Sequence, residues 1–145
     1  MSFLKVFNQP LPFILQDIIT NCWGSAGPGN IQFCLFNAVH APLPMDTAAT
    51  YNAIECAFPG YARQIVASAA WGAPFLSLDT ALSLGPPVQF VRGIGVQAPS
   101  NVYGYYVLQE GGNIIWAQAF DTPVPIVNPG DTVLFAPQFS FLSQH

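Results

Sequence analysis

The stretch of sequence that decides the fold is VYGYYVLQ-EGGN-IIWAQAF, residues 102–120. Aromatic and β-branched residues fill both outer segments, and these residue types favour extended strands. The central EGGN supplies glycine and asparagine, which adopt the backbone conformations of a tight turn with little strain. The stretch therefore predicts a β-hairpin with strands over residues 102–109 and 114–120.

The two faces of this hairpin are both mostly apolar. Successive side chains of a strand point to opposite faces of the sheet. On the return strand, the residues expected on one face are Ile114, Trp116, Gln118 and Phe120. The opposite face is expected to carry Ile115, Ala117 and Ala119. We therefore expect covers on both sides: the second sheet of a sandwich on one, with a partner subunit as the candidate for the other.

The rest of the chain supplies further short strands separated by turn residues. They are predicted over residues 31–38, 63–71, 88–92, 122–127, 132–136 and 139–142. Pro123 and Pro125 remove ladder donors and so favour an edge strand. One short helix is predicted from Ala48 to Phe58, with Asp46 or Thr47 as its cap. Short strands at this spacing favour an all-β fold, an antiparallel β-sandwich of jelly-roll-like topology.

The chain is expected to divide into two parts. Residues 1–30 form an N-terminal arm and loop, and residues 31–145 a single β-sandwich domain. Residues 1–20 are apolar and proline-interrupted, with no clear period. We expect this arm to lie along a neighbouring subunit or, equally, against its own domain. Its candidate interface residues are Phe3, Leu4, Phe7, Phe13 and Ile14.

The chain is unusually poor in charge. Only 7% of its residues are charged and 52% are hydrophobic, against roughly 25% charged residues in an ordinary soluble domain. A surface of this kind has little charge repulsion to keep molecules apart. The composition predicts a protein that works as one copy in an assembly. The plainer alternative is a monomeric β protein that is simply charge-poor.

The same composition excludes several partners. The three cations, Lys5, Arg63 and Arg92, are scattered along the chain, whereas phosphate neutralisation needs several clustered Lys or Arg residues. We therefore expect no direct contact with nucleic acid. No apolar run approaches the roughly 20 residues of a spanning helix, so no membrane partner is expected. The N-terminus does not resemble a signal peptide.

Residues able to carry chemistry are few. Cys22, Cys34 and Cys56 show no CxxC spacing, which argues against a disulfide framework or a zinc site. His40 and the terminal His145 are too few for a histidine-based metal site. The carboxylates mostly adjoin turn residues, where short acids bond to their own backbone. Gly93-Ile94-Gly95 lacks the pattern of a phosphate loop. We therefore predict no enzymatic activity, no cofactor and no metal.

Five residues of the sandwich domain complete the candidate interface. Arg63 and Arg92 each adjoin an apolar strand, where they can pair across an interface or stack on aromatic rings; ordinary surface positions are the equal alternative. Tyr103, Tyr105 and Trp116 come from the hairpin. The chain's tyrosines also suggest a carbohydrate-binding platform, although core filling is the commoner role of aromatic residues in β-sandwiches.

Four segments, taken in order, resemble a group of small phage-encoded virion proteins. They are FPGYARQ (58–64), VYGYYV (102–107), NIIWAQAF (113–120) and residues 124–137 with their Asn-Pro-Gly-Asp turn. The order of a short helix, FPGYA, a GYY hairpin and a GDT strand carries the resemblance, which spans roughly residues 46–142. It implies a virion component without enzymatic activity, commonly a trimeric β-sandwich.

The resemblance fits two virion parts. A capsid cement or decoration protein hides much of its surface against the major capsid protein and its own copies, so a charge-poor exterior suits it. A tail-fibre or adhesin tip that recognises host surface glycans must stay exposed in the medium. The sequence therefore favours the cement protein, located in a virion assembled in the host cytoplasm, with the adhesin as the alternative.

Overall fold

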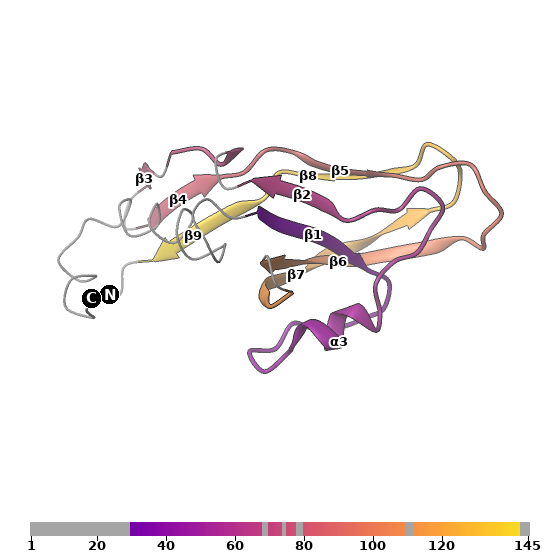
Figure 1. Ribbon diagram of the computed structural model, residues 1–145, viewed down its shortest axis with the longest axis horizontal. Coiled ribbons are helices and arrows are strands. Elements are labelled where there is room, and N and C mark those ends of the chain that lie inside the picture. The colour runs from indigo at the N-terminus through magenta and orange to yellow at the C-terminus, as the bar shows by residue number, and fades with distance from the viewer. Residues whose placement is uncertain (1–29, 68–69, 74, 78–79, 110–111, 143–145) are drawn as a thin grey trace.

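The computed structural model describes residues 30–67, 70–73, 75–77, 80–109 and 112–142. Figure 1 shows their arrangement. In chain order the elements are β1 (Asn30–Phe36), α3 (Ala48–Asn52), β2 (Gln64–Ala67), β3 (Phe75–Ser77), β4 (Thr80–Leu84), β5 (Val88–Val91), β6 (Ser100–Gln109), β7 (Ile114–Ile126), β8 (Thr132–Phe135) and β9 (Gln138–Leu142). The predicted all-β class with one short helix is confirmed over these residues.

The strands of the described residues form three antiparallel sheets. The largest has the order β2-β1-β6-β7, and the others are β3-β4-β9 and the pair β5-β8. Three of the pairings are nested, because β6 pairs with β7, β5 with β8 and β4 with β9. The chain from β4 to β9 therefore runs out to the β6–β7 hairpin and folds back along itself.

One face of the four-stranded sheet packs against the β5-β8 pair (Figure 1). The core between them contains inward-facing residues from the four-stranded sheet and from the β5-β8 pair. They are Ile31, Phe33, Leu35, Val66, Val88, Phe90, Tyr105, Val107, Ile126 and Val133. Aromatic rings bridge the layers, since Tyr105 stacks on Phe135 with ring centroids 4.4 Å apart. Burial of these apolar side chains is the main force that holds the two layers together.

The opposite face of the sheet is covered by α3. Cys34, Phe36, Tyr106 and Leu108 are buried there together with Tyr51 of the helix. Tyr51 stacks on Tyr106 with ring centroids 5.2 Å apart. At this part of the hairpin the second cover is therefore the chain's own helix, where the sequence suggested a partner subunit.

Two register irregularities shift the hairpin's alternation. One lies between Val102 and Gly104 and the other between Val107 and Leu108. Across the second, Ile114 packs with the helix-side cluster, whereas Ile115 packs beside Trp116 on the β5-β8 side. The face assignment predicted for the two isoleucines is therefore wrong, because a bulge adds a residue that strict alternation does not include.

Local boundaries differ from the predicted ones where pairing with β1 intervenes. Helix α3 ends at Asn52, not near Phe58, because Glu55 forms an antiparallel bridge with Phe36. The backbone N–H of Cys56 donates to the Leu35 carbonyl at 2.9 Å, which keeps this segment extended. Among the residues described, no helix is long and apolar enough to cross a membrane.

The edge position predicted for residues 122–127 and the turn predicted after them are confirmed, but these residues continue β7 and do not form a separate strand. Strand β7 runs without a break through Pro123 and Pro125 and lies at the edge of its sheet, as the prolines indicated. The turn after it is built by Asp131, whose carboxylate accepts the backbone N–H groups of Val127 and Asn128, both at 2.8 Å.

Candidate functional site

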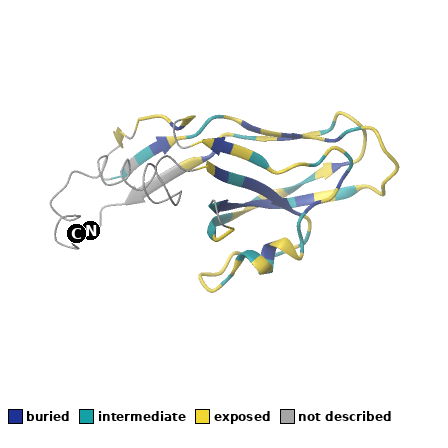
Figure 2. Ribbon diagram, in the orientation of Figure 1, coloured by how far each residue is buried: buried dark blue, intermediate teal, exposed yellow. Residues whose placement is uncertain are grey.

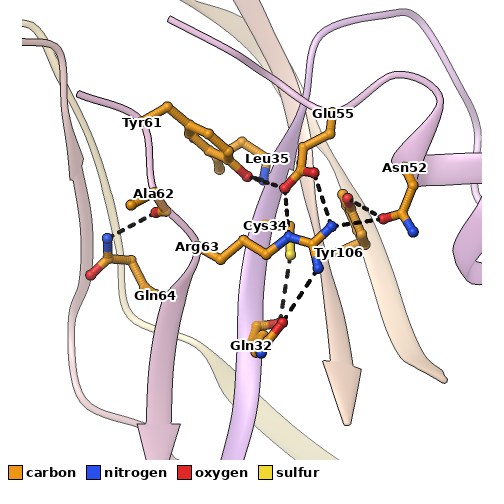
Figure 3. Close-up of polar contacts among 10 residues, drawn as sticks. All are labelled: Gln32, Cys34, Leu35, Asn52, Glu55, Tyr61, Ala62, Arg63, Gln64 and Tyr106. Atoms are coloured by element: carbon orange, nitrogen blue, oxygen red, sulfur yellow. Dashed lines mark hydrogen bonds and ion pairs between the residues drawn. The ribbon is translucent and has the colours of Figure 1, made fainter. Parts of the chain in front are cut away.

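Among the residues that the structure describes, the densest polar cluster joins β1, the segment after α3 and the approach to β2 (Figure 3). At its centre, the Arg63 guanidinium donates two parallel hydrogen bonds to the Glu55 carboxylate. Nε donates to Oε2 and Nη2 donates to Oε1, each at 2.9 Å. The bridge between Phe36 and Glu55 places the carboxylate beside β1, and Arg63 directly precedes the strand that pairs with β1. Neighbouring backbone pairings thus bring the two charges together.

Uncharged side chains complete this cluster. The Tyr61 hydroxyl donates to Glu55 Oε2 at 2.8 Å and accepts the backbone N–H of Leu35 at 3.0 Å. Asn52 Oδ1 accepts bonds from Arg63 Nη2 at 3.1 Å and from the Tyr106 hydroxyl at 2.8 Å. Each side chain is used to tie one backbone segment to another.

The electrostatics of Glu55 make it a poor proton donor or acceptor. Burial by itself would raise the pKa of its carboxyl, but the hydrogen bonds from Arg63 and Tyr61 outweigh burial and hold the pKa below its usual range. The same bond to Glu55 raises the pKa of Arg63. Both groups are therefore ionised, and their main hydrogen-bonding positions are occupied within the chain. This arrangement suits a structural clamp and not a catalytic pair.

The two cysteines of the described region are buried and inert as nucleophiles. Burial raises the pKa of the Cys34 thiol to about 12, and it does the same for Cys56. A thiolate is the reactive form of cysteine, so at neutral pH neither residue is poised for attack. Cys22 lies outside the described residues.

A second, smaller cluster surrounds Asp46. Its Oδ2 atom lies 2.7 Å from His40 Nε2 and accepts bonds from the Leu43 backbone N–H and the Tyr51 hydroxyl, both at 2.8 Å. The hydrogen bond from His40, followed by that from Leu43, lowers the pKa of the Asp46 carboxyl. Because Tyr51 is buried and donates to the same oxygen, the cluster fastens the loop before α3 to the helix.

These clusters offer no metal chemistry within the part of the chain that the structure describes. No group of three or more His, Cys, Asp or Glu residues there is arranged to hold a metal ion.

Comparisons with protein-family models, with curated proteins and with solved structures find no match to this chain.

The predicted interface residues of the sandwich domain lie in different surroundings. Arg63 is part of the clamp with Glu55, its side chain 35% exposed. Tyr103 and Trp116 are partly buried against the two core clusters. Tyr105 is buried in the chain's own core, so it is a packing residue and offers no surface to a partner. Phe3, Leu4, Phe7, Phe13 and Ile14 lie outside the described residues.

Arg92, which the sequence also offered as an interface residue, is buried within the chain. It is only 4% exposed, and its guanidinium donates to the backbone carbonyls of Gln97 at 3.1 Å, Ile126 at 3.4 Å and Val127. Its Nε atom is buried without a hydrogen-bond partner among the described residues. Arg92 therefore joins the loop after β5 to the end of β7 from inside the chain.

The surface feature that the sequence analysis missed lies beside Arg92. Ile94 and Val96 are 93% and 107% exposed in the loop after β5. Val91 and Val127, at the same end of the folded molecule, are each 43% exposed. The available signal was the uncharged Gly93-Ile94-Gly95-Val96, which is apolar although its glycines predict a surface loop.

Proposed function

We propose that this protein is a structural component of a bacteriophage virion, a capsid cement or decoration protein that stabilises the shell. In this proposal it acts as a homo-oligomer, a trimer, on the major capsid protein. The observation that carries the proposal is the set of large apolar side chains that remain exposed among the described residues of a chain with only 7% charged residues. Covering such side chains with another surface removes them from water, which lowers the free energy of the system.

The use of the charged groups supports this proposal. Glu55 pairs with Arg63, Arg92 is buried, and the carboxylates of Asp46 and Asp131 accept backbone N–H groups. In contrast, the exposed large hydrophobic residues in the described part of the chain are Val39, Leu43, Met45, Ile65, Phe75, Leu76, Leu84, Val91, Ile94, Val96, Val127 and Leu134. These five charged groups are thus engaged within the chain, while Asp121 stays exposed, and much of the described surface is left for apolar contact.

The architecture is compatible with a jelly-roll-like sandwich, which is part of this proposal. In a jelly roll, strands pair as the two arms of one long, folded hairpin. The nested pairs β6·β7, β5·β8 and β4·β9 follow such an order. Together with the resemblance to small phage virion proteins, this order favours a role in the virion.

The alternative, a glycan-binding adhesin tip, draws less support from the described residues. Its candidate platform was made of tyrosines, whose flat faces must be open for a sugar to stack on them. Tyr51, Tyr105 and Tyr106 are buried, and Tyr61 and Tyr103 pack against the core clusters. We therefore keep the adhesin as an outcome of the test.

The test is to locate the protein on its own virion. Purified chain is mixed with capsids of the encoding phage from which the protein has been removed, then sedimented and imaged by cryo-electron microscopy. We expect saturable binding at symmetry-related capsid positions and a higher temperature of capsid rupture. Density at the tail tip, or binding to host glycans without capsid binding, would support the adhesin and contradict the cement protein.

A further inference from the structure

An apolar tip, defined as Val91, Ile94, Val96 and Val127, lies at one end of the molecule. The β5–β6 and β7–β8 loops meet there, and Figure 2 shows them largely exposed. Ile94 and Val96 project as the two most exposed large hydrophobic side chains of the described residues. Single exposed hydrophobic residues are common on proteins, but adjacent ones at one tip mark a contact surface.

This tip is held in place from beneath by Arg92. Its buried guanidinium donates to the carbonyl of Gln97 in one loop, and to the carbonyls of Ile126, the last residue of β7, and of Val127 in the other loop. The backbone adds two bonds, because Arg92 N–H donates to the Asp131 carbonyl at 2.9 Å and Gly130 N–H donates to the Arg92 carbonyl at 2.8 Å. The hydrogen bonds of Arg92 therefore hold the two loops together.

A second anchor holds the loop from its other side. The Gly93 N–H donates to the Pro59 carbonyl at 2.7 Å. Gly95 lies so close to the Pro59 ring that a Cβ on it would approach within 2.8 Å of a ring carbon. Ile94 and Val96 are thus presented by an anchored backbone, and docking a pre-organised loop loses less conformational entropy than docking a mobile one.

The chemistry of this tip selects an uncharged partner. Residues 93–99 and 127–130 contain no charged side chain, and the Asp131 carboxylate is occupied by the N–H groups of Val127 and Asn128. A charged partner surface would lose its hydration against the tip without gaining a counter-charge. A partner as charge-poor as this chain, with 7% charged residues, meets the requirement.

The chain itself offers an uncharged groove at the other end of β5. A groove of about 220 Å³ lies between β2 and the segment that leads into β5. Its lining mixes apolar residues, among them Ile65, Pro86 and Pro87, with the uncharged polar side chains of Gln64 and Gln89, and none of its lining residues is charged. Ile65 is 64% exposed there, so its side chain is available for contact.

We infer that the apolar tip of one copy docks in this groove of a second copy. Because tip and groove are different surfaces, the contact is heterologous, and a heterologous contact closes into a ring when the rotation per copy allows it. The inference deepens the proposed function and rests on its homo-oligomer part alone. It does not depend on what the oligomer binds.

The experiment uses two variants of the full chain, each of which removes one half of the contact. Ile94→Ser/Val96→Ser alters the tip, and Ile65→Lys alters the groove. Val39→Ser/Met45→Ser is the matched control, since these residues are 83% and 81% exposed and lie in the loop before α3. Sedimentation velocity over a range of concentrations measures association, and thermal unfolding checks that each variant is folded.

We expect wild type and control to associate alike, and the tip variant to raise the dissociation constant by about a hundredfold, as loss of two buried aliphatic side chains predicts. The groove variant should also be monomeric. Mixed together, the two variants should form a one-to-one dimer, because the intact groove of one meets the intact tip of the other.

Other outcomes separate the two proposals. If wild type is monomeric at all concentrations, the homo-oligomer part of the proposed function fails together with the inference. An oligomer that survives the tip variant, or a mixture that stays monomeric, overturns the inference alone. Capsid binding by wild type is scored separately, so its failure would leave the tip-to-groove contact standing.

Discussion

Glu55 and Arg63 show how single residues are used in this chain. The pair is partly exposed, with side-chain exposures of 19% and 35%, yet it is bidentate and further fixed by Tyr61. Exposed ion pairs contribute little to stability unless their geometry is favourable or they form a network. This pair meets both conditions, and it links three backbone segments that are separate in sequence.

Replacing the carboxylate tests this contribution. Glu55→Gln is expected to lower the free energy of unfolding by about 1–2 kcal/mol at pH 7, because charge-assisted bonds to Arg63 and Tyr61 are weakened. Urea denaturation measures the change. Asp121→Asn, at an exposed acid, is the matched control and should change stability by less than about 0.5 kcal/mol.

The same substitution predicts a pH dependence. The pKa of Glu55 is lower in the folded than in the unfolded chain, so its stabilisation is present above the unfolded pKa of about 4.3 and is lost as pH falls through the folded value. The difference between wild type and Glu55→Gln should therefore shrink below about pH 4.3. A difference that stays constant to pH 2 would contradict the role of the charge.

At the scale of elements, β1, β6 and β7 approach one another closely at Gly104. This glycine pairs with Phe36 on one side and with Ala119 on the other, beside the first register shift. A Cβ placed on it would overlap the Gln118 carbonyl oxygen and the Phe36 ring. The glycine is thus needed for space in the middle of a strand, where glycine is otherwise unfavourable.

Gly104→Ala is therefore expected to reduce the free energy of unfolding by at least about 2 kcal/mol, because backbone and a buried ring must move to admit one methyl group. Gly93→Ala is the control, since a Cβ there meets its nearest atom at 3.5 Å. Equal stability of the two variants in urea would show that the strands tolerate a wider spacing.

At the scale of the whole molecule, the described residues form two core clusters on opposite faces of one sheet. Cys56 belongs to the cluster under β5-β8, and Cys34 belongs to the one under α3. Both thiols are free, and they are only 3% and 0% exposed. Their accessibility therefore reports whether the two layers open separately or together.

Thiol labelling with Ellman's reagent makes that measurement. In a Cys22→Ser background, Cys34→Ser and Cys56→Ser variants each leave one buried thiol. We expect both to react slowly and at the same rate, set by global unfolding, since each lies within a packed layer of the same sheet. Much faster labelling of Cys34 would show that α3 opens alone, contrary to a single cooperative unit.

Features that depend on residues close together in sequence were predicted correctly, whereas features that depend on contacts between distant segments were not. The hairpin turn, the proline-marked edge strand and the Asn-Pro-Gly-Asp turn depend on residues within a few positions of one another, and sequence analysis placed them all. It misassigned Ile114 and Ile115, because the bulge responsible depends on pairing with β6. It also offered Arg92 and Tyr105 as interface residues, because rarity and aromatic character do not reveal burial.

The amino-acid sequence by itself determined that the chain is a charge-poor β protein, with strands and turns set by local propensity and side-chain alternation. Only the tertiary structure decided how the few charges are used. It joined Glu55 to Arg63 through β1, buried Arg92 between two loops, and left Ile94 and Val96 exposed at the tip. The physical reason is that burial and pairing depend on contacts between distant segments, which no local pattern records.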